Sequence, residues 1–126
     1  MSEEATRRAI EIYREEHETW DVERIMSVFA DDAVWQSAGQ APLEGKAAVQ
    51  GNIERMAANP AQRRMRHLRE WVDGDHAAVE WEVHHLGADG GWQPYRFGVN
   101  LYEVVDGKIR SIRLYGFFAE GARPAG

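Results

Sequence analysis

The segment Phe29-Ala-Asp-Asp-Ala-Val-Trp-Gln-Ser37, followed by Leu43-Glu-Gly-Lys-Ala-Ala-Val49, decides how this chain folds. Apolar residues recur at three- and four-residue steps just before it, which predicts a helix over residues 22–30 that ends at the Asp-Asp pair. Residues 33–37 then predict one short, isolated strand. A further helix is expected over residues 45–58, where a glycine precedes the helix and a proline follows it.

The remainder of the chain predicts one more helix and a run of strands. Residues 3–20 carry apolar side chains at helical spacing, with one face inward. Four long strands are predicted at residues 63–72, 76–86, 92–105 and 108–118. Asp73-Gly74 and Asp106-Gly107 separate two pairs of them, and Asp-Gly is a strong signal for a tight hairpin. We therefore expect an α+β domain over residues 1–118 with an antiparallel meander, and a flexible tail over residues 119–126.

Composition excludes several classes of function. The 126 residues are enough for a single domain with one core. The 15 Lys and Arg residues against 21 Asp and Glu give a net charge of −6, which argues against nucleic acid or an anionic membrane as the main partner. The absence of cysteine excludes disulfides, thiolate metal sites and cysteine nucleophiles. No run approaches the ~20 apolar residues that span a bilayer, and no secretory signal begins the chain, so the expected location is the cytoplasm.

The order of these elements resembles the nuclear-transport-factor-2-like fold of ketosteroid isomerases, SnoaL-like polyketide cyclases and limonene epoxide hydrolases. The resemblance covers nearly the whole chain. It implies a cone-shaped, strongly curved antiparallel sheet, with three N-terminal helices closing the concave face over a deep, mostly apolar pocket. The fold hosts isomerases, cyclases, dehydratases, hydrolases and binding modules, so the resemblance implies more about the fold than about the chemistry.

The resemblance also assigns residues to the site. Tyr13 precedes Asp21 by eight residues, as the oxyanion-hole tyrosine of the isomerases precedes the acid that opens their second helix. Their second oxyanion donor, a protonated Asp, falls on Asn100, whose amide donates the same hydrogen bond. Their catalytic base falls on Ser37, whose hydroxyl cannot move a carbon-bound proton near neutral pH. The acid on the last strand of the epoxide hydrolases falls on Leu114, so that water-activating set is incomplete as well.

Side-chain alternation then predicts the rest of the pocket. One face is expected to carry Met65, His67, Arg69 and Trp71 on the second strand, Trp81, Val83 and His85 on the third, and Arg96, Gly98, Asn100 and Tyr102 on the fourth. His67 and His85 resemble strand histidines of scytalone-dehydratase-like and SnoaL-like proteins. His17 lies one helical turn after Tyr13. We expect Tyr13, His67, His85 and Asn100 to be catalytic, and the substrate to be bound by His17, Trp35, Ser37, Trp81, Tyr102 and Leu114.

The leading hypothesis is a cofactor-free enzyme that dehydrates, isomerises or cyclises a small hydrophobic oxygenated molecule, such as a polyketide, terpenoid or steroid-like ketone. Tyr13 and Asn100 would stabilise an oxyanion while His67 or His85 moves the proton. The alternatives are a non-catalytic small-molecule-binding module and an epoxide-hydrolase-like hydrolase without the usual acids. A metal site is not predicted, because the three candidate histidines come from separate elements and no inward carboxylate joins them.

A homodimer is also predicted from the alternation. If Asn100 faces inward, then Tyr95, Phe97, Val99 and Leu101 face outward, with Tyr115 beside them on the last strand. Contiguous apolar surface of this kind usually marks an association site, and two-fold pairing is the commonest closed arrangement.

Overall fold

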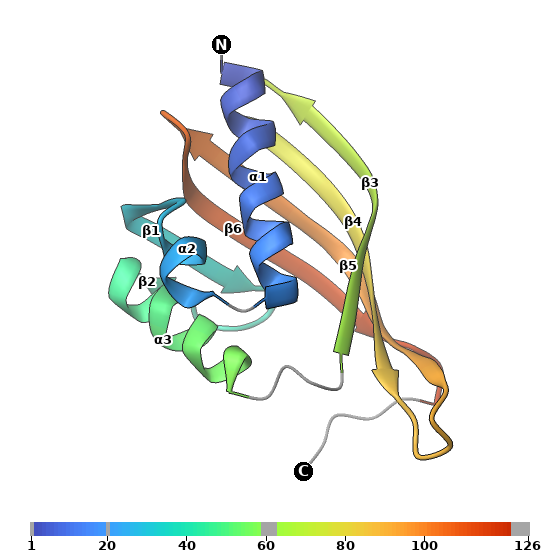
Figure 1. Ribbon diagram of the computed structural model, residues 1–126. Helices are drawn as coiled ribbons and strands as arrows, with labels where there is room; N and C mark the ends of the chain where they lie inside the picture. The colour runs from blue at the N-terminus through green and yellow to red at the C-terminus, as the bar shows by residue number, and fades with distance from the viewer. Residues whose placement is uncertain (1, 20, 59–62, 122–126) are drawn as a thin grey trace.

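The computed structural model describes residues 2–19, 21–58 and 63–121, and it has the predicted α+β fold (Figure 1). The elements are α1 (Ser2–Thr19), α2 (Val22–Met26), β1 (Phe29–Ser37), β2 (Leu43–Glu44), α3 (Lys46–Ala57), β3 (Arg63–Asp73), β4 (His76–Leu86), β5 (Trp92–Val105) and β6 (Lys108–Phe118). The strands form one sheet in the order β2-β1-β6-β5-β4-β3. Strands β3 to β6 pair antiparallel with one another, as predicted, whereas β1 lies parallel to β6.

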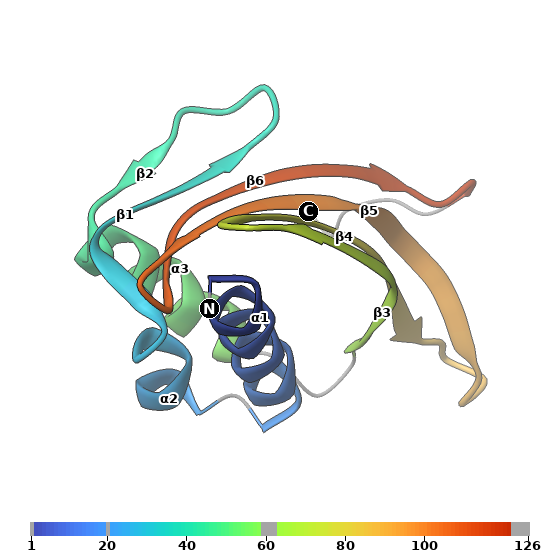
Figure 2. The ribbon, with the colours of Figure 1, turned by 90° about the horizontal axis from the view of Figure 1, so that it is seen from above.

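The sheet is strongly curved, and the helices cover its concave face. Figure 2 shows β3 to β6 bending around α1, with α2 and α3 packed near β1. The core between them is apolar, and its largest fully buried side chains include Ile10 of α1, Phe29, Ile53 of α3 and Ile112. Each such side chain contributes about 1.5–3 kcal/mol when it leaves water. The apolar stripe of α1 therefore fixes this helix against the sheet, which positions Tyr13 on the concave side.

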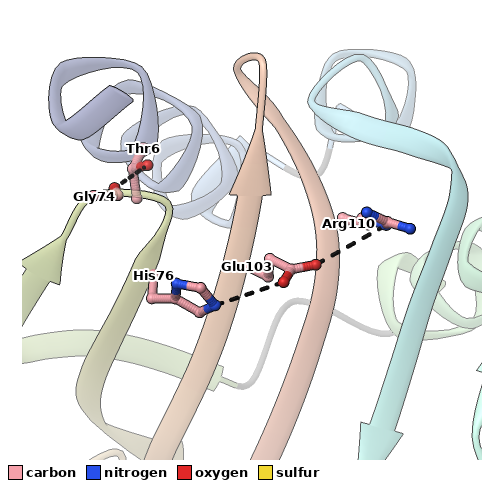
Figure 3. Close-up of polar contacts among 5 residues, drawn as sticks. All are labelled: Thr6, Gly74, His76, Glu103 and Arg110. Carbon is pink, nitrogen blue, oxygen red and sulfur yellow. Dashed lines mark hydrogen bonds and ion pairs between the residues drawn. The ribbon is translucent and has the colours of Figure 1, made fainter. Parts of the chain in front are cut away.

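Polar contacts join several elements near the β3–β4 turn (Figure 3). The Thr6 hydroxyl of α1, which is fully buried, donates to the carbonyl oxygen of Gly74 in the β3–β4 turn at 2.8 Å. On the outer face, Glu103 lies between His76 at 3.5 Å and Arg110 at 3.9 Å. Those ionic groups are largely exposed, so the pairs contribute little to stability. The buried Thr6 hydrogen bond adds a polar contact between α1 and the β3–β4 turn to the apolar packing of the helix.

The tight turn between β5 and β6 is as predicted. Asp106 has φ 52° and Gly107 has φ 76°, the two positive values that a type I′ hairpin requires. In the described part of the chain, no helix is both long and apolar enough to cross a membrane. The predicted stop at Pro60 and most of the predicted tail, residues 122–126, lie outside the described residues.

The predicted helix over residues 22–30 is wrong beyond Met26. The Ser27 hydroxyl donates to the Arg24 carbonyl at 2.6 Å, which ends α2, and the Ile109 amide donates to the Val28 carbonyl at 2.6 Å. The chain therefore joins the sheet at Phe29, and the Asp-Asp pair lies inside β1 at a shift in register with β6. The two-residue strand β2 was not predicted, because so short a segment has no measurable alternation.

The predicted face of β3 is wrong beyond His67. The register with β4 shifts between His67 and Arg69, so that Leu68 is the extra residue of a β-bulge. The alternation reverses there, and Trp71, which was predicted to face inward, is 52% exposed. Arg69 also lies outward, where it pairs with Glu80 at 3.5 Å.

A second bulge corrects the predicted orientation of Tyr95. The register of β4 with β5 shifts where Val83 pairs with Arg96 and His84 pairs with Pro94, which leaves Tyr95 without an opposite residue. Its side chain lies on the concave side and not in the outward apolar face. Phe97, Leu101 and Tyr115 of that predicted face are exposed.

Candidate functional site

A cavity of about 200 Å³ lies between the concave face of the sheet, α1 and α3. It is lined by Tyr13, Trp35, Met56, Arg63, Met65, Trp81, Val83, Tyr95, Arg96, Asn100, Leu114 and Phe118. Five of the residues predicted for the site are among them, and they come from α1, β1, β4, β5 and β6. The wall is largely aromatic and aliphatic, with an amide and a phenol at one end and two guanidinium groups as its charges.

Asn100 is held in one orientation by two hydrogen bonds. The indole N–H of Trp81 donates to Asn100 Oδ1 at 2.8 Å, and Asn100 Nδ2 donates to the Tyr102 hydroxyl oxygen at 3.1 Å. All three residues are buried. An amide nitrogen has two N–H groups, so Asn100 retains a second donor in the pocket wall. Tyr102 itself lies behind Asn100 and does not line the cavity.

Tyr13 lies beside this chain of hydrogen bonds. Its ring makes edge contacts with Phe29, Trp35 and Tyr102 at centroid distances of 5.8–6.3 Å. Burial raises the pKa of Tyr13 well above its usual value, and the neighbouring Tyr102 adds to the rise. Burial also raises the pKa of Tyr102; the hydrogen bond from Asn100 opposes this rise, and Glu70 adds to it. Both phenols therefore stay protonated near neutral pH, as hydrogen-bond donors must.

Two glycines lie against the ring of Trp81, which lines the cavity. Gly98 of β5 pairs directly with Gly116 of β6, and the Trp81 ring lies against both. A β-carbon at Gly98 would stand 2.8 Å from Trp81 Cζ2, and one at Gly116 would stand 3.2 Å from Trp81 Cη2. A glycine inside a strand often marks such a close approach, so the two glycines explain how Trp81 packs flat on the sheet.

His85 lies one side chain away from the cavity. Its ring stacks on Tyr95 at 3.6 Å between centroids, and its Nε2 atom is buried without a hydrogen-bond partner. Burial lowers the pKa of His85, and the nearby Arg63 lowers it further, so the imidazole is neutral near pH 7. Tyr95, not His85, provides the pocket wall here.

The other predicted site residues lie outside the cavity wall. His67 is half-buried on β3 opposite Trp81, and Ser37 is half-buried at the end of β1 opposite Leu114. The side chain of His17 is outside the described part of the structure. Among the lining residues that the structure describes there is thus no carboxylate and no imidazole. The described side chains also contain no cluster of three metal-binding residue types.

Arg96 is a site residue that the sequence reasoning missed. Strand alternation placed it on the same face as Asn100, but its charge was not interpreted as functional. The guanidinium lies over the Phe118 ring at 5.2 Å, and the Nε atom is buried without a hydrogen-bond partner. Arg63, at the start of β3, adds a second cation to the wall.

The family model of the SnoaL-like domain matches residues 8–112 of the chain. This match runs from within α1 to the first half of β6 and contains both Tyr13 and Asn100. No curated protein matches the sequence.

Several solved structures share the fold. An LEH-like epoxide hydrolase of M. tuberculosis is 19% identical with TM-score 0.75, covering 95% of this chain and 86% of that one. A putative polyketide cyclase of Sinorhizobium meliloti is 24% identical with TM-score 0.67, covering 84% and 92%. An NTF2-like protein of unknown function from Cytophaga hutchinsonii is 15% identical with TM-score 0.74, covering 93% and 100%. At these identities the similarity establishes the fold alone.

Proposed function

Since the chain belongs to the SnoaL-like domain family, we propose that it isomerises, cyclises or dehydrates a small hydrophobic, oxygenated molecule without a cofactor. The observation that carries this proposal is the fixed amide of Asn100 beside the protonated phenol of Tyr13, inside an otherwise apolar cavity. A cavity of about 150 Å³ holds benzene. The cavity of about 200 Å³ therefore favours a substrate with one substituted ring, or an acyclic one of similar size, over a steroid.

The proposed chemistry is polarisation of a carbonyl group. The carbonyl oxygen of the ligand accepts hydrogen bonds from the second N–H of Asn100 and from the Tyr13 hydroxyl. When a proton leaves the adjacent carbon, negative charge develops on that oxygen, and both donors bind the charged oxygen more strongly than the neutral one. Trp81 and Tyr102 keep the amide aimed at the oxygen, so little reorganisation is needed as the charge forms.

His85 and His67 are the proposed proton carriers, and His85 is the better supported. Its lowered pKa leaves a neutral imidazole that can accept a proton at physiological pH. Its Nε2 has no hydrogen-bond partner, so the nitrogen lone pair or N–H is available. Rotation of the Tyr95 ring, which separates His85 from the cavity, would bring the imidazole to the ligand.

A non-catalytic binding module is the second candidate. It is favoured by the absence of a carboxylate or imidazole among the described lining residues. His85→Ala separates the two candidates: an enzyme loses turnover but keeps its ligand, whereas a binding module has no turnover to lose and keeps its affinity.

We expect the affinity of the protein for para-substituted phenols to rise with their acidity, from phenol to 4-nitrophenol. A bound phenolate oxygen imitates an enolate oxygen. A more acidic phenol releases its proton to the solvent at a lower cost when it binds to the donors Tyr13 and Asn100 as the phenolate. Tyr13→Phe, which removes only the hydroxyl, should weaken 4-nitrophenol binding about tenfold. Isothermal titration calorimetry below the pKa of each phenol measures both effects.

Tyr115→Phe is the matched control for this experiment, because the Tyr115 hydroxyl lies on the outer face of the sheet. It should leave the affinities unchanged. Affinities that do not depend on acidity, or that survive Tyr13→Phe, would exclude an oxyanion-binding pocket.

We also propose that two copies of the chain pair through the convex face of the sheet. Five large apolar side chains lie on that face, each between 37% and 63% exposed: Trp71, Phe97, Leu101, Tyr115 and Phe117. They lie over β3, β5 and β6, and the rings of Phe97 and Phe117 are 6.0 Å apart. The described helices lie on the concave side of the sheet (Figure 2), so none of them covers this convex patch. Exposed patches of this kind usually mark association.

Light scattering should therefore give about twice the chain mass of 14.4 kDa. Phe97→Glu should reduce it to one chain, because the new carboxylate would be buried without a partner in the contact. Leu86→Glu is the control, since Leu86 is similarly exposed, at 42%, but lies at the end of β4 away from the patch. A wild-type mass of one chain at micromolar concentration would refute the dimer.

A further inference from the structure

Arg96 is built into the concave face of the sheet. It pairs with Phe118 of β6, and its guanidinium lies over that ring. Gly116 leaves room for the group: a β-carbon there would stand 2.9 Å from Arg96 Nη2. The guanidinium is therefore held against the pocket wall by the strand, the ring and the glycine together.

This cation has no anionic partner among the residues that the structure describes. Its Nε is buried without a hydrogen-bond acceptor, and none of the ion pairs of the described residues includes it. The arginines of the outer face differ, since Arg66 lies 3.7 Å from Glu82 and Arg69 lies 3.5 Å from Glu80. A partly buried cation without a partner is costly, and the contact with an aromatic ring offsets only part of that cost. A bound anion would offset the rest.

Further basic groups surround the same end of the cavity. Arg63 lines it, and His85, opposite Arg63 in the β3–β4 register, lies behind Tyr95 with its Nε2 unpaired. No acidic side chain is among the described lining residues. In a protein with a net charge of −6, a basic end without acids is a local feature that would attract an anion.

We propose that the ligand of this pocket is a small carboxylic acid, whose carboxylate binds the guanidinium of Arg96 with Arg63 beside it. The apolar body of the ligand then lies along Trp81 and Leu114 toward Asn100. A planar guanidinium matches a planar carboxylate through two parallel N–H groups. Only one of the two guanidinium groups, that of Arg96, is partly buried, since Arg63 is exposed. One partly buried cation in a cavity of this size suits a monoanion better than a phosphate ester.

The inference names the substrate class of the proposed function and rests on it. Arg96 and Asn100 face the same side of β5, with about 13 Å of strand between their Cα atoms. The Arg96 guanidinium shortens this gap, because it reaches Gly116, which pairs with Gly98 between the two residues. A ligand that reaches both side chains carries a carbonyl and a carboxylate joined by a short chain. An aryl keto acid has this form.

The test compares 4-oxo-4-phenylbutanoate with butyrophenone, which lacks the carboxylate. Calorimetry should show the acid binding about 10- to 100-fold more tightly than the neutral ketone. Arg96→Met should remove that preference, so that the acid and the ketone bind with similar affinity. Arg96→Lys should restore only part of it, because lysine keeps the charge but not the two parallel donors. Arg69→Met on the outer face is the matched control and should bind both ligands as the wild type does.

The outcomes separate this inference from the proposed function. Arg96→Met removes a buried charge, so its melting temperature should not fall. If butyrophenone binds in a Tyr13-dependent way but the acid binds no better, the carboxylate site is wrong and the proposed function stands. If neither compound binds, both are wrong. Tighter binding of phenyl phosphate than of the acid would assign the basic end to phosphate esters and overturn the carboxylate assignment.

Discussion

Gly98→Ala is expected to destabilise the fold by about 3 kcal/mol or more, although it adds only one methyl group. The new β-carbon would overlap the backbone carbonyl oxygen of Tyr115, and it would stand 2.9 Å from the Cα atom of Gly116. Both atoms belong to the backbone of β6. They can move only if the pairing of β5 with β6 opens, and this pairing supports the Trp81 ring of the cavity wall. Urea unfolding followed by circular dichroism measures the loss.

Two other glycines provide the controls for this experiment. Gly51, inside α3, has no heavy atom within 4 Å of an added β-carbon, so Gly51→Ala should stabilise the protein by about 0.5–1 kcal/mol. Gly116→Ala should have an intermediate effect, because its nearest contact is the flexible side chain of Arg96. If the free energy of unfolding of Gly98→Ala lies within about 1 kcal/mol of the wild-type value, then β5 and β6 do not approach as closely as described.

Local sequence signals predicted the architecture well. Helical periodicity predicted α1 and α3, and the long strand-like segments after residue 62 predicted β3 to β6. The predicted bounds of these elements agree with the structure within a residue or two. The Asp106-Gly107 pair gave the β5–β6 hairpin, because both positive φ values favour these two residue types. These signals succeed because each depends on residues that are neighbours in the chain.

The errors come from contacts between distant residues. The bulges at Leu68 and Tyr95 reverse the faces of their strands. No local residue marks the bulge at Leu68, whereas Pro94 next to Tyr95 is a residue that sheets accept mainly at edges and bulges. Phe29 leaves the expected helix because Ile109, eighty residues later, pairs with the chain at Val28. A single sequence does not contain that information in any local form.

The same distinction applies to the candidate site. Tyr13, Asn100 and Leu114 were found through the family resemblance, and alternation along β4 placed Trp81 on the face of the same cavity. The faces of the inward residues were thus predictable wherever the strand was regular. What alternation does not give is the depth of a side chain. Alternation places His85 on the inward face, yet the ring of Tyr95, at a bulge, lies between it and the cavity. Whether Arg96 has an ionic partner depends on which acidic side chains the fold brings close to it.

Asn100→Leu is expected to reduce kcat about 10²- to 10³-fold, since it removes an oriented donor from the proposed oxyanion site. The reaction to measure is the exchange of the α-protons of 4-oxo-4-phenylbutanoate for deuterium in D2O, followed by NMR. Leucine also leaves the Trp81 N–H without its acceptor, which should destabilise the fold by about 1–3 kcal/mol. The rate is therefore compared at a temperature where both proteins are folded. Asn52→Ala, an asparagine substitution on α3 outside the lining, should exchange at the wild-type rate.

Asn100→Asp distinguishes a donor to the oxyanion from a merely structural amide. Burial would raise the pKa of the new carboxyl group, and below that pKa the protonated acid still donates a hydrogen bond. The variant should therefore keep much of the wild-type rate at low pH and lose it as pH rises through the pKa, because a carboxylate beside the forming oxyanion repels it. The wild-type amide does not titrate, so its rate should lack this descending limb. A rate that is the same for asparagine, aspartate and leucine at every pH would mean that Asn100 only holds Trp81 and Tyr102 in place, and that the pocket binds its ligand without activating it.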